Sequence, residues 1–581
     1  MSKKVVLFSL ISLLSSTFVS LSYNSGNTSP KLKGIKYEQK DEDFAGQSLT
    51  IYNCSDYIDD TLIEEFQEKY NCKVNYHTYD TNETMYNQFT LQPEGTYDLI
   101  CTSDYMVQRM VREQLVIPID IEKDCPIYNE YSTPMLREKL RNMKTDTDGD
   151  GIKDVNLDQY SAGYMWGTLG IVYDPFCSDT IREDVKSWDV FWNPQYKDLI
   201  SIKNSMRDTF VAGLMHAYYD SDYTDVENIA YQARVVFLEE MEKATTEEEK
   251  ELARNKYNKV IQDLFDLVIT SEDYKEILDV VKKELISLKD NIFGLEVDSG
   301  KNDIITGKVK MNLAWSGDAV YSIDCALEEQ GKVLEYYVPD DGSNVWYDSW
   351  SIPKGGNKEL ACKFIDFLST PDIAARNMDY IGYTSFITCD EVFDLVSDWY
   401  GVSSYFEGRE YYGPYYDEEY EEDVEGSIVE YQGKFYQCIQ DACGVLPTDS
   451  EYFTEIDEEE LGLVEGYDMS HLFKENTTSG RSLVIYPYEG SENQLKTQYP
   501  DQDTIARCAI MNDFEKVNDD VVIMWGQVKA YTNMIPYYVI LILTATGVIG
   551  AITFSAIMKR RSSRNKRRLE ELSKWLMKKN Y

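Results

Sequence analysis

Strand-like and helix-like segments alternate along residues 48–101, and this alternation constrains the fold more than any other feature of the chain. Short apolar segments at 48–53, 72–79 and 98–101 have the composition of strands, and residues 60–70 have the spacing of an amphipathic helix. Strands that alternate with helices pair in parallel, with right-handed connections. The sequence therefore predicts an α/β fold with a parallel sheet, in which ligands bind at the carboxyl ends of the strands.

Three short stretches, far apart in the chain, each place an acid beside an aromatic ring. They are Cys54-Ser55-Asp56-Tyr57, Trp315-Ser316-Gly317-Asp318 and Trp346-Tyr347-Asp348. Ring faces attract an organic cation and its apolar stem, while carboxylates accept the hydrogens of its ammonium group. A single pair of this kind is common, because buried tryptophans often lie near surface acids. A fold that unites the three would form an amine-binding slot.

The length and charge of the chain exclude several classes of protein. At 581 residues it exceeds a single typical core, so two or more domains are expected. A net charge of −45 leaves no broad basic surface for phosphates, so we expect no nucleic-acid partner. The three histidines are widely spaced, and neither a nucleophile–base pair nor a zinc-ligand pattern occurs. We therefore expect that the protein is not an enzyme.

Both ends of the chain have features of membrane targeting. Residues 1–22 are typical of a signal peptide or N-terminal hydrophobic segment, and residues 23–45 form a polar linker. Residues 534–558 contain no charged residue and are largely apolar, which predicts a transmembrane helix rather than a buried one. The tail at 559–581 has a net charge of +8, so we expect it in the cytoplasm. The predicted localisation is the cell membrane, with one pass and an extracellular ectodomain.

Longer stretches of the sequence resemble a known family. The matching runs occur in the family's order and cover most of residues 47–385. They are IYNCSDYIDDTLIEEFQEKYNCKVNYHTYDTNETMYNQF (51–89), YDLICTSDYMVQRM (97–110), MWGTLGIVYD (165–174), SWDVFWNPQYKDLISI (187–202), RDTF (207–210), LAWSGDA (313–319), VWYDSWSIP (345–353) and CKFIDFLSTPDIAARNMDYIGY (362–383). The chain thereby resembles the spermidine/putrescine-binding proteins of bacterial ABC importers, which are extracellular solute-binding proteins.

The resemblance implies a two-lobed fold of the periplasmic-binding-protein type (type II), whose parallel-sheet lobes close on a ligand. We expect the first lobe at 46–160 and 349–390, and the second lobe at 161–348 and 491–532. The implied partners are a polyamine ligand and the permease and ATPase subunits of an ABC transporter. The sequence has no phosphate-binding loop of its own, so the energy for transport has to come from such a partner.

The resemblance also implies a set of ligand-binding residues. Trp346 and Asp348 are two positions apart in a predicted strand, so their side chains point the same way. Two positions depart from the family: Cys54 stands where relatives have Trp, and Ser205 stands where spermidine binders have an acid. The implied set is Ser55, Asp56, Tyr57, Ser103, Tyr105, Asp208, Trp315, Asp318, Trp346 and Asp348.

Two regions lengthen the chain beyond the family. Residues 218–268 are charged and predict a solvated helical hairpin. Residues 391–490 form an acidic, tyrosine-rich insertion, and its part at 426–456 alternates like a small β unit. That unit resembles carbohydrate-binding modules with a V-x-Y-x-G-x-x-Y pattern. A loop domain without a ligand is the alternative.

Residues 146–154 have the oxygen-ligand spacing of an EF-hand-like calcium loop. The twelfth position of the loop is Leu157 instead of the bidentate Glu. An acidic turn without metal is therefore the alternative to structural calcium, and no other cofactor is expected. The candidate ligands are Asp146, Asp148, Asp150 and Asp154.

The leading functional hypothesis is a membrane-anchored receptor that captures putrescine or spermidine outside the cell for import by an ABC transporter. A receptor of the same fold for another organic cation is the first alternative, because Cys54 and Ser205 depart from the family. A surface adhesion protein that binds glycan through residues 391–490 is the second alternative.

Overall fold

A computed structural model describes residues 44–218, 229–297, 299–417, 422–531 and 535–579. The predicted signal peptide at 1–22 and the linker at 23–45 lie outside the described residues, apart from 44–45. The chain divides into two compact units, Met1–Trp525 and Gly526–Tyr581. All of the predicted ligand-binding residues belong to the first unit.

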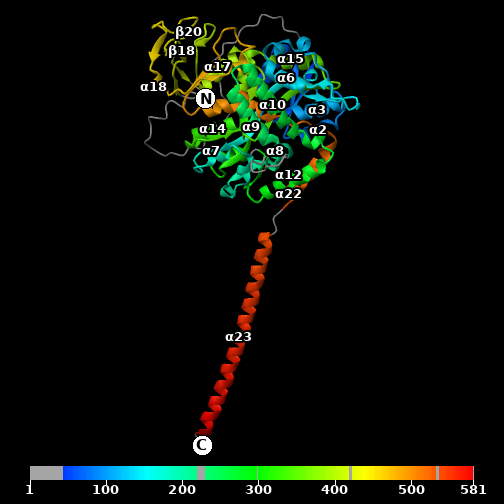
Figure 1. The fold of residues 1–581 in the computed structure, drawn as a ribbon, viewed down its shortest axis with the longest axis vertical. Coiled ribbons are helices and arrows are strands. Elements are labelled where there is room, and N and C mark those ends of the chain that lie inside the picture. The colour runs from blue at the N-terminus through cyan, green and yellow to red at the C-terminus, as the bar shows by residue number, and fades with distance from the viewer. Residues whose placement is uncertain (1–43, 219–228, 298, 418–421, 532–534, 580–581) are drawn as a thin grey trace. The chain divides into compact units, whose positions relative to one another are not determined.

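The first lobe is built on parallel strands, as the alternating pattern predicts. β1 (Ser48–Cys54) pairs in parallel with β2 (Lys73–Tyr79) and with β3 (Leu99–Ser103). The crossover helix α1 (Asp60–Tyr70) begins at Asp59, whose carboxylate accepts the Thr61 N–H. Figure 1 shows further helices gathered around this lobe, namely α2 (Asn82–Phe89), α3 (Asp104–Arg112), α6 (Pro134–Asn142) and α15 (Lys358–Leu368).

Two long strands join this lobe to the next. β7 (Ser161–Tyr173) and β12 (Ser343–Pro353) pair antiparallel over most of their length. β12 also pairs with β3 of the first lobe, and β7 also pairs with β10 (Met311–Trp315) of the second. The main path of the sheet follows the order β2-β1-β3-β12-β7-β10 and continues with β8 (Ile200–Lys203) and β9 (Gly294–Glu296). The chain therefore crosses between the lobes inside one continuous sheet, which confirms the two-lobed α/β fold.

The second lobe repeats the parallel arrangement. β8 (Ile200–Lys203) pairs in parallel with β10 and with β9 (Gly294–Glu296). Two helices follow these strands directly: α8 (Met206–Tyr218) comes after β8, and α14 (Ser316–Gln330) comes after β10. The carboxyl ends of the strands therefore lead straight into the segments that contain Asp208 and Asp318.

The helical insertion is less solvated than its charge predicts. α9 (Ile229–Lys243) and α10 (Glu247–Phe265) follow one another, and Thr246 and Glu249 form a capping box at the start of α10. One face of α10 is buried through Tyr257, Ile261 and other apolar residues. Asn258 donates to the backbone carbonyls of Ala506 and Cys508. The two helices are therefore solvated on one side only, because the apolar spacing of α10 packs its other face against the C-terminal segment of the same unit.

The acidic insertion forms a small sheet with its own core. β18 (Ile428–Tyr431), β19 (Lys434–Cys438) and β21 (Phe453–Ile456) pair antiparallel. Tyr411 and several other buried side chains pack against this sheet. The unit has a hydrophobic core separate from that of the two lobes.

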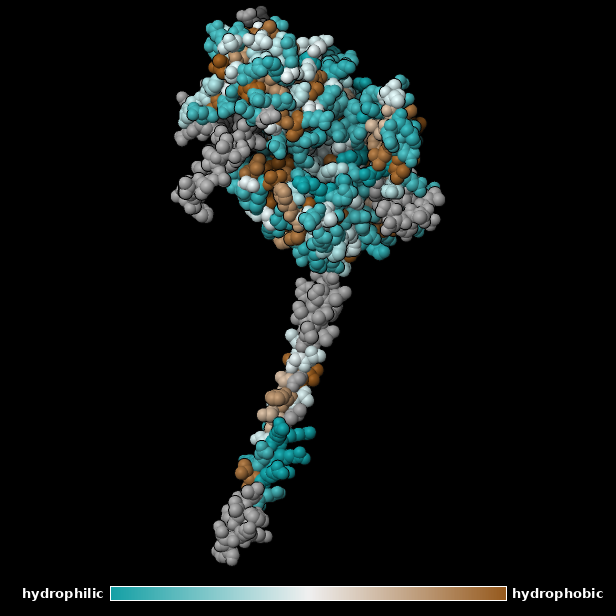
Figure 2. All heavy atoms as spheres, turned by 60° about the vertical axis from the view of Figure 1, so that its left-hand side comes forward, coloured by the Kyte–Doolittle hydropathy of each residue, from teal (hydrophilic) through white to brown (hydrophobic). Residues whose placement is uncertain are grey.

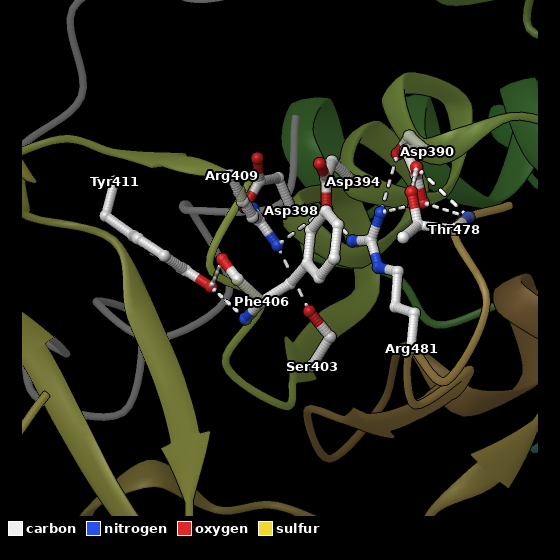
Figure 3. A network of polar contacts seen from close by, with 9 residues as sticks. All are labelled: Asp390, Asp394, Asp398, Ser403, Phe406, Arg409, Tyr411, Thr478 and Arg481. Atoms are coloured by element: carbon white, nitrogen blue, oxygen red, sulfur yellow. Dashed lines mark hydrogen bonds and ion pairs between the residues drawn. The ribbon is translucent and has the colours of Figure 1, made fainter. Parts of the chain in front are cut away.

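A polar network fastens this sheet's surroundings to α17 (Asp390–Tyr400), the helix at the start of the insertion (Figure 3). The Arg481 guanidinium pairs with Asp390 at 2.7 Å and also with Asp394. Arg409 pairs with Asp394 at 3.3 Å and with Asp398 at 2.6 Å. Both guanidinium groups are buried, so each carboxylate of α17 in the network has a cationic partner.

The prediction of a transmembrane helix at 534–558 is not supported. α23 (Ile535–Lys579) runs without a break from the apolar stretch into the basic tail. Figure 2 shows a less polar section of this helix followed by a hydrophilic one. Among the described residues, no helix has both the length and the apolar character of a membrane span.

Candidate functional site

The ends of several strands keep solvent access at the junction of the lobes. In β3 and in β10 the last residue alone is partly exposed, and these residues are Ser103 and Trp315. In β12 every residue is buried except Asp348, which lies in the middle of the strand. A β-bulge separates Asp348 from Ser349 in the pairing with β7. The site is therefore open where parallel strands of both lobes end.

Asp348 lies at the centre of this junction. Its carboxylate accepts one hydrogen bond from the Tyr57 hydroxyl at 2.7 Å and another from the Ser103 hydroxyl at 2.6 Å. Ser103 is in turn held by the side chain of Asn82 at 2.9 Å. The structure thus brings together one predicted residue from each of three distant segments.

The partners of Asp348 are all neutral. Among the described residues, no Lys, Arg or His side chain forms an ion pair with it. Burial raises the pKa of Asp348, and the hydrogen bonds from Ser103 and Tyr57 oppose this rise only in part. Burial and the neighbouring Asp348 also raise the pKa of Tyr57 well above its usual value. A desolvated carboxylate without a cation favours a cationic ligand.

Tyr383 links the hinge strand to the second lobe, and the sequence analysis missed it. Its hydroxyl donates to Asp318 at 3.0 Å. Its ring lies 5.6 Å from the ring of Tyr57 and 5.6 Å from that of Trp346. The signal that could have found it is its position at the end of the run that resembles the family, just before β13 (Thr384–Ser385).

Asp318 already has cationic partners within the chain. Lys203 lies 3.1 Å from one carboxylate oxygen, and Lys301 lies 3.3 Å from the other. Burial acts to raise the pKa of Asp318, but the two lysines outweigh it, so the pKa lies below its usual value. The sequence analysis did not foresee either lysine, because both are distant in sequence from the Trp315–Asp318 motif.

Trp315 and Asp208 lie together on the second lobe. The indole Nε1 donates to the Asp208 carboxylate at 3.2 Å. Asp208 is buried in the first turn of α8, and burial raises its pKa. The ammonium of Lys203 lies 4.4 Å from the centre of the Trp315 ring.

Tyr105 is turned toward other partners. Its hydroxyl donates to Glu83 at 2.9 Å, and the Arg207 guanidinium lies 3.7 Å from the centre of its ring. Arg207 itself donates to the backbone carbonyls of Met511 and Asn512. A cation of the chain therefore covers one face of the Tyr105 ring.

Ser55 and Asp56 do not join the other predicted residues. Both are exposed in the turn after β1. Asp56 has a left-handed backbone conformation, with a φ of 53°, which Asp tolerates better than most residues. In the described part of the chain, neither side chain forms a hydrogen bond or ion pair with another predicted site residue. We call the predicted residues that connect to one another, directly or through Tyr383 and Lys203, the interlobe cluster: Tyr57, Ser103, Asp208, Trp315, Asp318, Trp346 and Asp348.

Asp104 is a further acid that the sequence analysis did not assign. Its carboxylate accepts the backbone N–H of Tyr105 at 2.6 Å and that of Tyr347 at 3.1 Å. Burial raises its pKa to about 7. Asp104 thus ties the start of α3 to the hinge strand beside Asp348.

The candidate calcium loop lies apart from the interlobe cluster. The carboxylates of Asp146, Asp148 and Asp150 have oxygens within 4.8 Å of one another, whereas Asp154 is not part of this group. The Asp146 carboxylate accepts the backbone N–H groups of Gly149 and Gly151, which lowers its pKa. The three acids have the donor chemistry that suits calcium.

A cavity of about 280 Å³ lies in the first lobe, away from the cluster. Ile119, Arg137 and Asp158 are among its lining residues, and none of the predicted ligand-binding residues borders it. Arg141 on its wall pairs with Asp158 at 2.8 Å. The cavity is therefore not the site that the acid–aromatic pairs predict.

The fold and the geometry of the cluster can now be compared with known proteins. The family model described as bacterial extracellular solute-binding protein matches residues 61–392, which is more than half of the chain. The chain belongs to this family of solute-binding proteins. The resemblance predicted from the sequence is confirmed.

Relatives within this family are named for polyamines. The spermidine/putrescine-binding periplasmic protein of Salmonella typhimurium is 27% identical over 338 residues, which cover 58% of this chain and 76% of the relative. The putrescine-binding periplasmic protein PotF of Escherichia coli is 22% identical, over 58% of this chain and 78% of its own. These relatives are binding proteins, which supports the prediction that this solute-binding protein is not an enzyme.

A solved structure of the same kind covers more of the chain. The spermidine/putrescine ABC transporter substrate-binding protein PotD from Streptococcus pneumoniae is 22% identical. The match covers 83% of this chain and 99% of that protein, with a TM-score of 0.47.

The predicted localisation, a single-pass protein of the cell membrane, is wrong. The curated relatives are named as periplasmic binding proteins. The helices of the described residues include none that could span a membrane. The prediction rested on an apolar stretch followed by basic residues.

Proposed function

We propose that this solute-binding protein captures a polyamine and delivers it to the permease and ATPase subunits of an ABC transporter. The observation that carries the proposal is Asp348, a partly buried carboxylate at the lobe junction whose hydrogen-bond donors, Tyr57 and Ser103, are neutral. An ammonium group supplies the charge that these donors lack.

The aromatic rings around Asp348 favour an organic amine over a metal ion. Tyr57, Tyr383 and Trp346 form a connected set of rings beside the carboxylate. Ring faces pack against methylene groups and attract a nearby ammonium, by about 0.5–2 kcal/mol for each contact. A metal ion would gain nothing from these rings and would find few oxygen ligands beside Asp348. The names of the relatives, which include spermidine and putrescine, agree with this choice.

Calorimetric titration of the full chain tests the proposal. Putrescine, spermidine and spermine are titrated at physiological salt. At low ionic strength the net charge of −45 would attract any cation non-specifically, and salt screens this attraction. Saturable binding of a polyamine that Asp348→Asn weakens supports the proposal. Saturable binding of a different organic cation favours the first alternative receptor. A heat of binding with members of a glycan panel, together with no heat of binding with amines, would favour adhesion through residues 391–490.

We further propose that Asp146, Asp148 and Asp150 bind calcium as a structural ion. Three carboxylates within 4.8 Å repel one another unless a cation lies between them. Calcium should raise the melting temperature of the full chain, and Asp148→Asn should reduce that increase. An equal increase in both proteins would contradict the proposal.

A further inference from the structure

We propose that Cys125 and Cys362 form a disulfide that joins the two chain segments of the first lobe and stabilises it. Cys125 precedes β7 and Cys362 follows β12, so both crossing strands and the second lobe lie between the two cysteines in the chain. The inference is independent of the proposed function, because it concerns how the first lobe is held together and not what the site binds.

Two polar contacts fasten α15 to the junction of α4 (Ile121–Asp124) and α5 (Pro126–Tyr131). The Lys358 ammonium, at the start of α15, pairs with the Asp124 carboxylate at 2.7 Å. Two turns further along α15, the Asp366 carboxylate accepts two backbone N–H groups of the first turn of α5, each at 3.0 Å. The two segments therefore lie side by side in a fixed register.

The two cysteines face each other between these contacts. Cys362 is four residues after Lys358 and four before Asp366, so the three side chains share one face of α15. Cys125 directly follows Asp124 and is the residue at which α4 gives way to α5. The thiols of Cys125 and Cys362 are joined by a hydrogen bond. The register that the flanking contacts set thus brings together two thiols from segments distant in the sequence.

Burial decides when such a bond can form. Cys125 is 0% exposed and Cys362 is 4% exposed. The hydrogen bond with Cys362, together with burial, raises the pKa of the Cys125 thiol. Because a thiol attacks a disulfide as its thiolate, this pair reacts slowly once the lobe has folded. We therefore expect the bond to form during folding and to be sheltered from reductants afterwards.

The reaction is a thiol–disulfide exchange with a small disulfide such as oxidised glutathione. The thiolate of one cysteine attacks the oxidant, which releases one glutathione thiolate and leaves a mixed disulfide. The other cysteine attacks the mixed disulfide, forms the bond between Cys125 and Cys362 and releases the second glutathione. The two cysteines lose two protons and two electrons, and one oxidised glutathione becomes two reduced molecules.

The bond would close a loop that runs from residue 125 to residue 362. Closing a long loop removes conformational entropy from the unfolded chain, which stabilises the folded state. The Tyr128 hydroxyl of α5 also accepts the Gly163 N–H of β7 at 2.7 Å. The disulfide would therefore link a helix that supports β7 to the helix that follows β12.

Peptide mapping of the full chain tests the inference. The protein is refolded from urea with reduced and oxidised glutathione, its free thiols are alkylated, and its peptides are identified by mass spectrometry without reduction. We expect one linked pair of peptides, which contains Cys125 and Cys362. The melting temperature should lie about 5 °C or more above that of protein refolded with reduced glutathione alone.

Variants separate this bond from other effects of oxidation. Cys125→Ala should lose both the linked peptides and the difference in melting temperature. Cys389→Ala is the matched control, because Cys389 is also buried, and it should keep both. Free thiols at positions 125 and 362, a bond from either to another cysteine, or equal melting temperatures of the oxidised and reduced wild type would overturn the inference.

A second preparation covers a failure to refold. The folded full chain is incubated with oxidised glutathione just below its melting temperature, where local opening exposes buried thiols. The same peptide map then decides. Linked peptides with Cys125 and Cys362 support the inference, and alkylated thiols at both positions overturn it.

Discussion

Two acids of the interlobe cluster differ in how their charge is balanced. Asp318 has Lys203 and Lys301 as partners, and its pKa lies below the usual value although burial acts to raise it. Asp348 has hydroxyl donors alone, and burial raises its pKa. Both acids stand in acid–aromatic motifs that look alike in the sequence. The surroundings of each residue therefore decide which acid is available to a ligand.

Asp348→Asn should weaken putrescine binding by about 30-fold or more, because the ligand ammonium loses its counter-charge in a desolvated site. The amide keeps the shape of the carboxyl group and can still pair with the hydroxyls of Tyr57 and Ser103. The melting temperature should therefore not fall. Calorimetry and thermal unfolding check the two halves of this prediction, and near-wild-type affinity would contradict it.

Acidification should weaken polyamine binding at pH values above the range in which an ordinary aspartate titrates. Protonation of Asp348 competes with the ligand ammonium, and burial raises the pKa of this carboxyl in the free protein. Affinity should be greatest at pH values above the raised pKa of Asp348. It should fall as the pH decreases through this pKa, which lies above the ordinary aspartate value of about 4. Titrations between pH 8 and pH 5 measure this dependence. An affinity that does not change over this range would count against it.

At the scale of elements, the helices and strands bring the cluster together through close contacts at glycine. A Cβ atom added at Gly317, in the first turn of α14, would lie 2.4 Å from the Tyr383 ring. A Cβ atom at Gly167 in β7 would lie 2.7 Å from the Trp346 ring. The absence of a side chain at these positions lets rings from other segments reach the acids of the second lobe.

Gly317→Ala should displace Tyr383 and weaken polyamine binding, with a loss of stability of about 1–3 kcal/mol from overpacking. The new methyl group would overlap the ring that donates to Asp318. Gly526→Ala is the matched control, because it also lies in a helix and a Cβ there would meet no other atom within 4 Å. Equal affinity in Gly317→Ala and the wild type would show that Tyr383 does not position the site.

The sequence predicts many of the helices and strands, but few of the side-chain contacts that join them. Periodicity locates α1 well, because this helix has a buried face and a local cap at Asp59, and short apolar segments locate β1 and β2. The spacing of Trp346 and Asp348 places both on one side of β12. Neither pattern can show that Lys203 reaches Asp318 or that Arg207 covers Tyr105, because those contacts join segments distant in the chain. The failed membrane prediction has a similar origin, since local hydropathy was its main support.

At the scale of the whole molecule, the acidic insertion packs in two ways. Its small sheet of β18, β19 and β21 has its own core, whereas other buried residues of the insertion, including Leu472, Phe473 and Ile485, belong to the core of the lobes. Arg409 and Arg481 tie the insertion to α17 (Figure 3). Closure of lobes around a ligand is the usual motion of two-lobed binding proteins. We therefore expect that damage to the small sheet leaves polyamine binding unchanged.

Arg481→Met should loosen the insertion without affecting the site. The substitution leaves Asp390 without its buried partner and Asp394 with Arg409 alone, and loss of a buried pair of this kind costs about 3–5 kcal/mol. Limited proteolysis should then cut within 401–490, while the dissociation constant for putrescine stays the same. Lys434→Met, which removes an exposed pair with Glu455, is the control and should change neither readout. A loss of binding in Arg481→Met would show that the insertion supports the cluster.

The most direct test of the central claim is a crystal structure of the full chain with putrescine. We expect one ligand nitrogen within about 3 Å of an Asp348 carboxylate oxygen, with the methylenes against the rings of Tyr57, Trp346 and Tyr383. Lys203 should remain on Asp318. A ligand bound elsewhere in the chain, or a ligand nitrogen that displaces Lys203 from Asp318 and leaves Asp348 without a cation, would contradict the account.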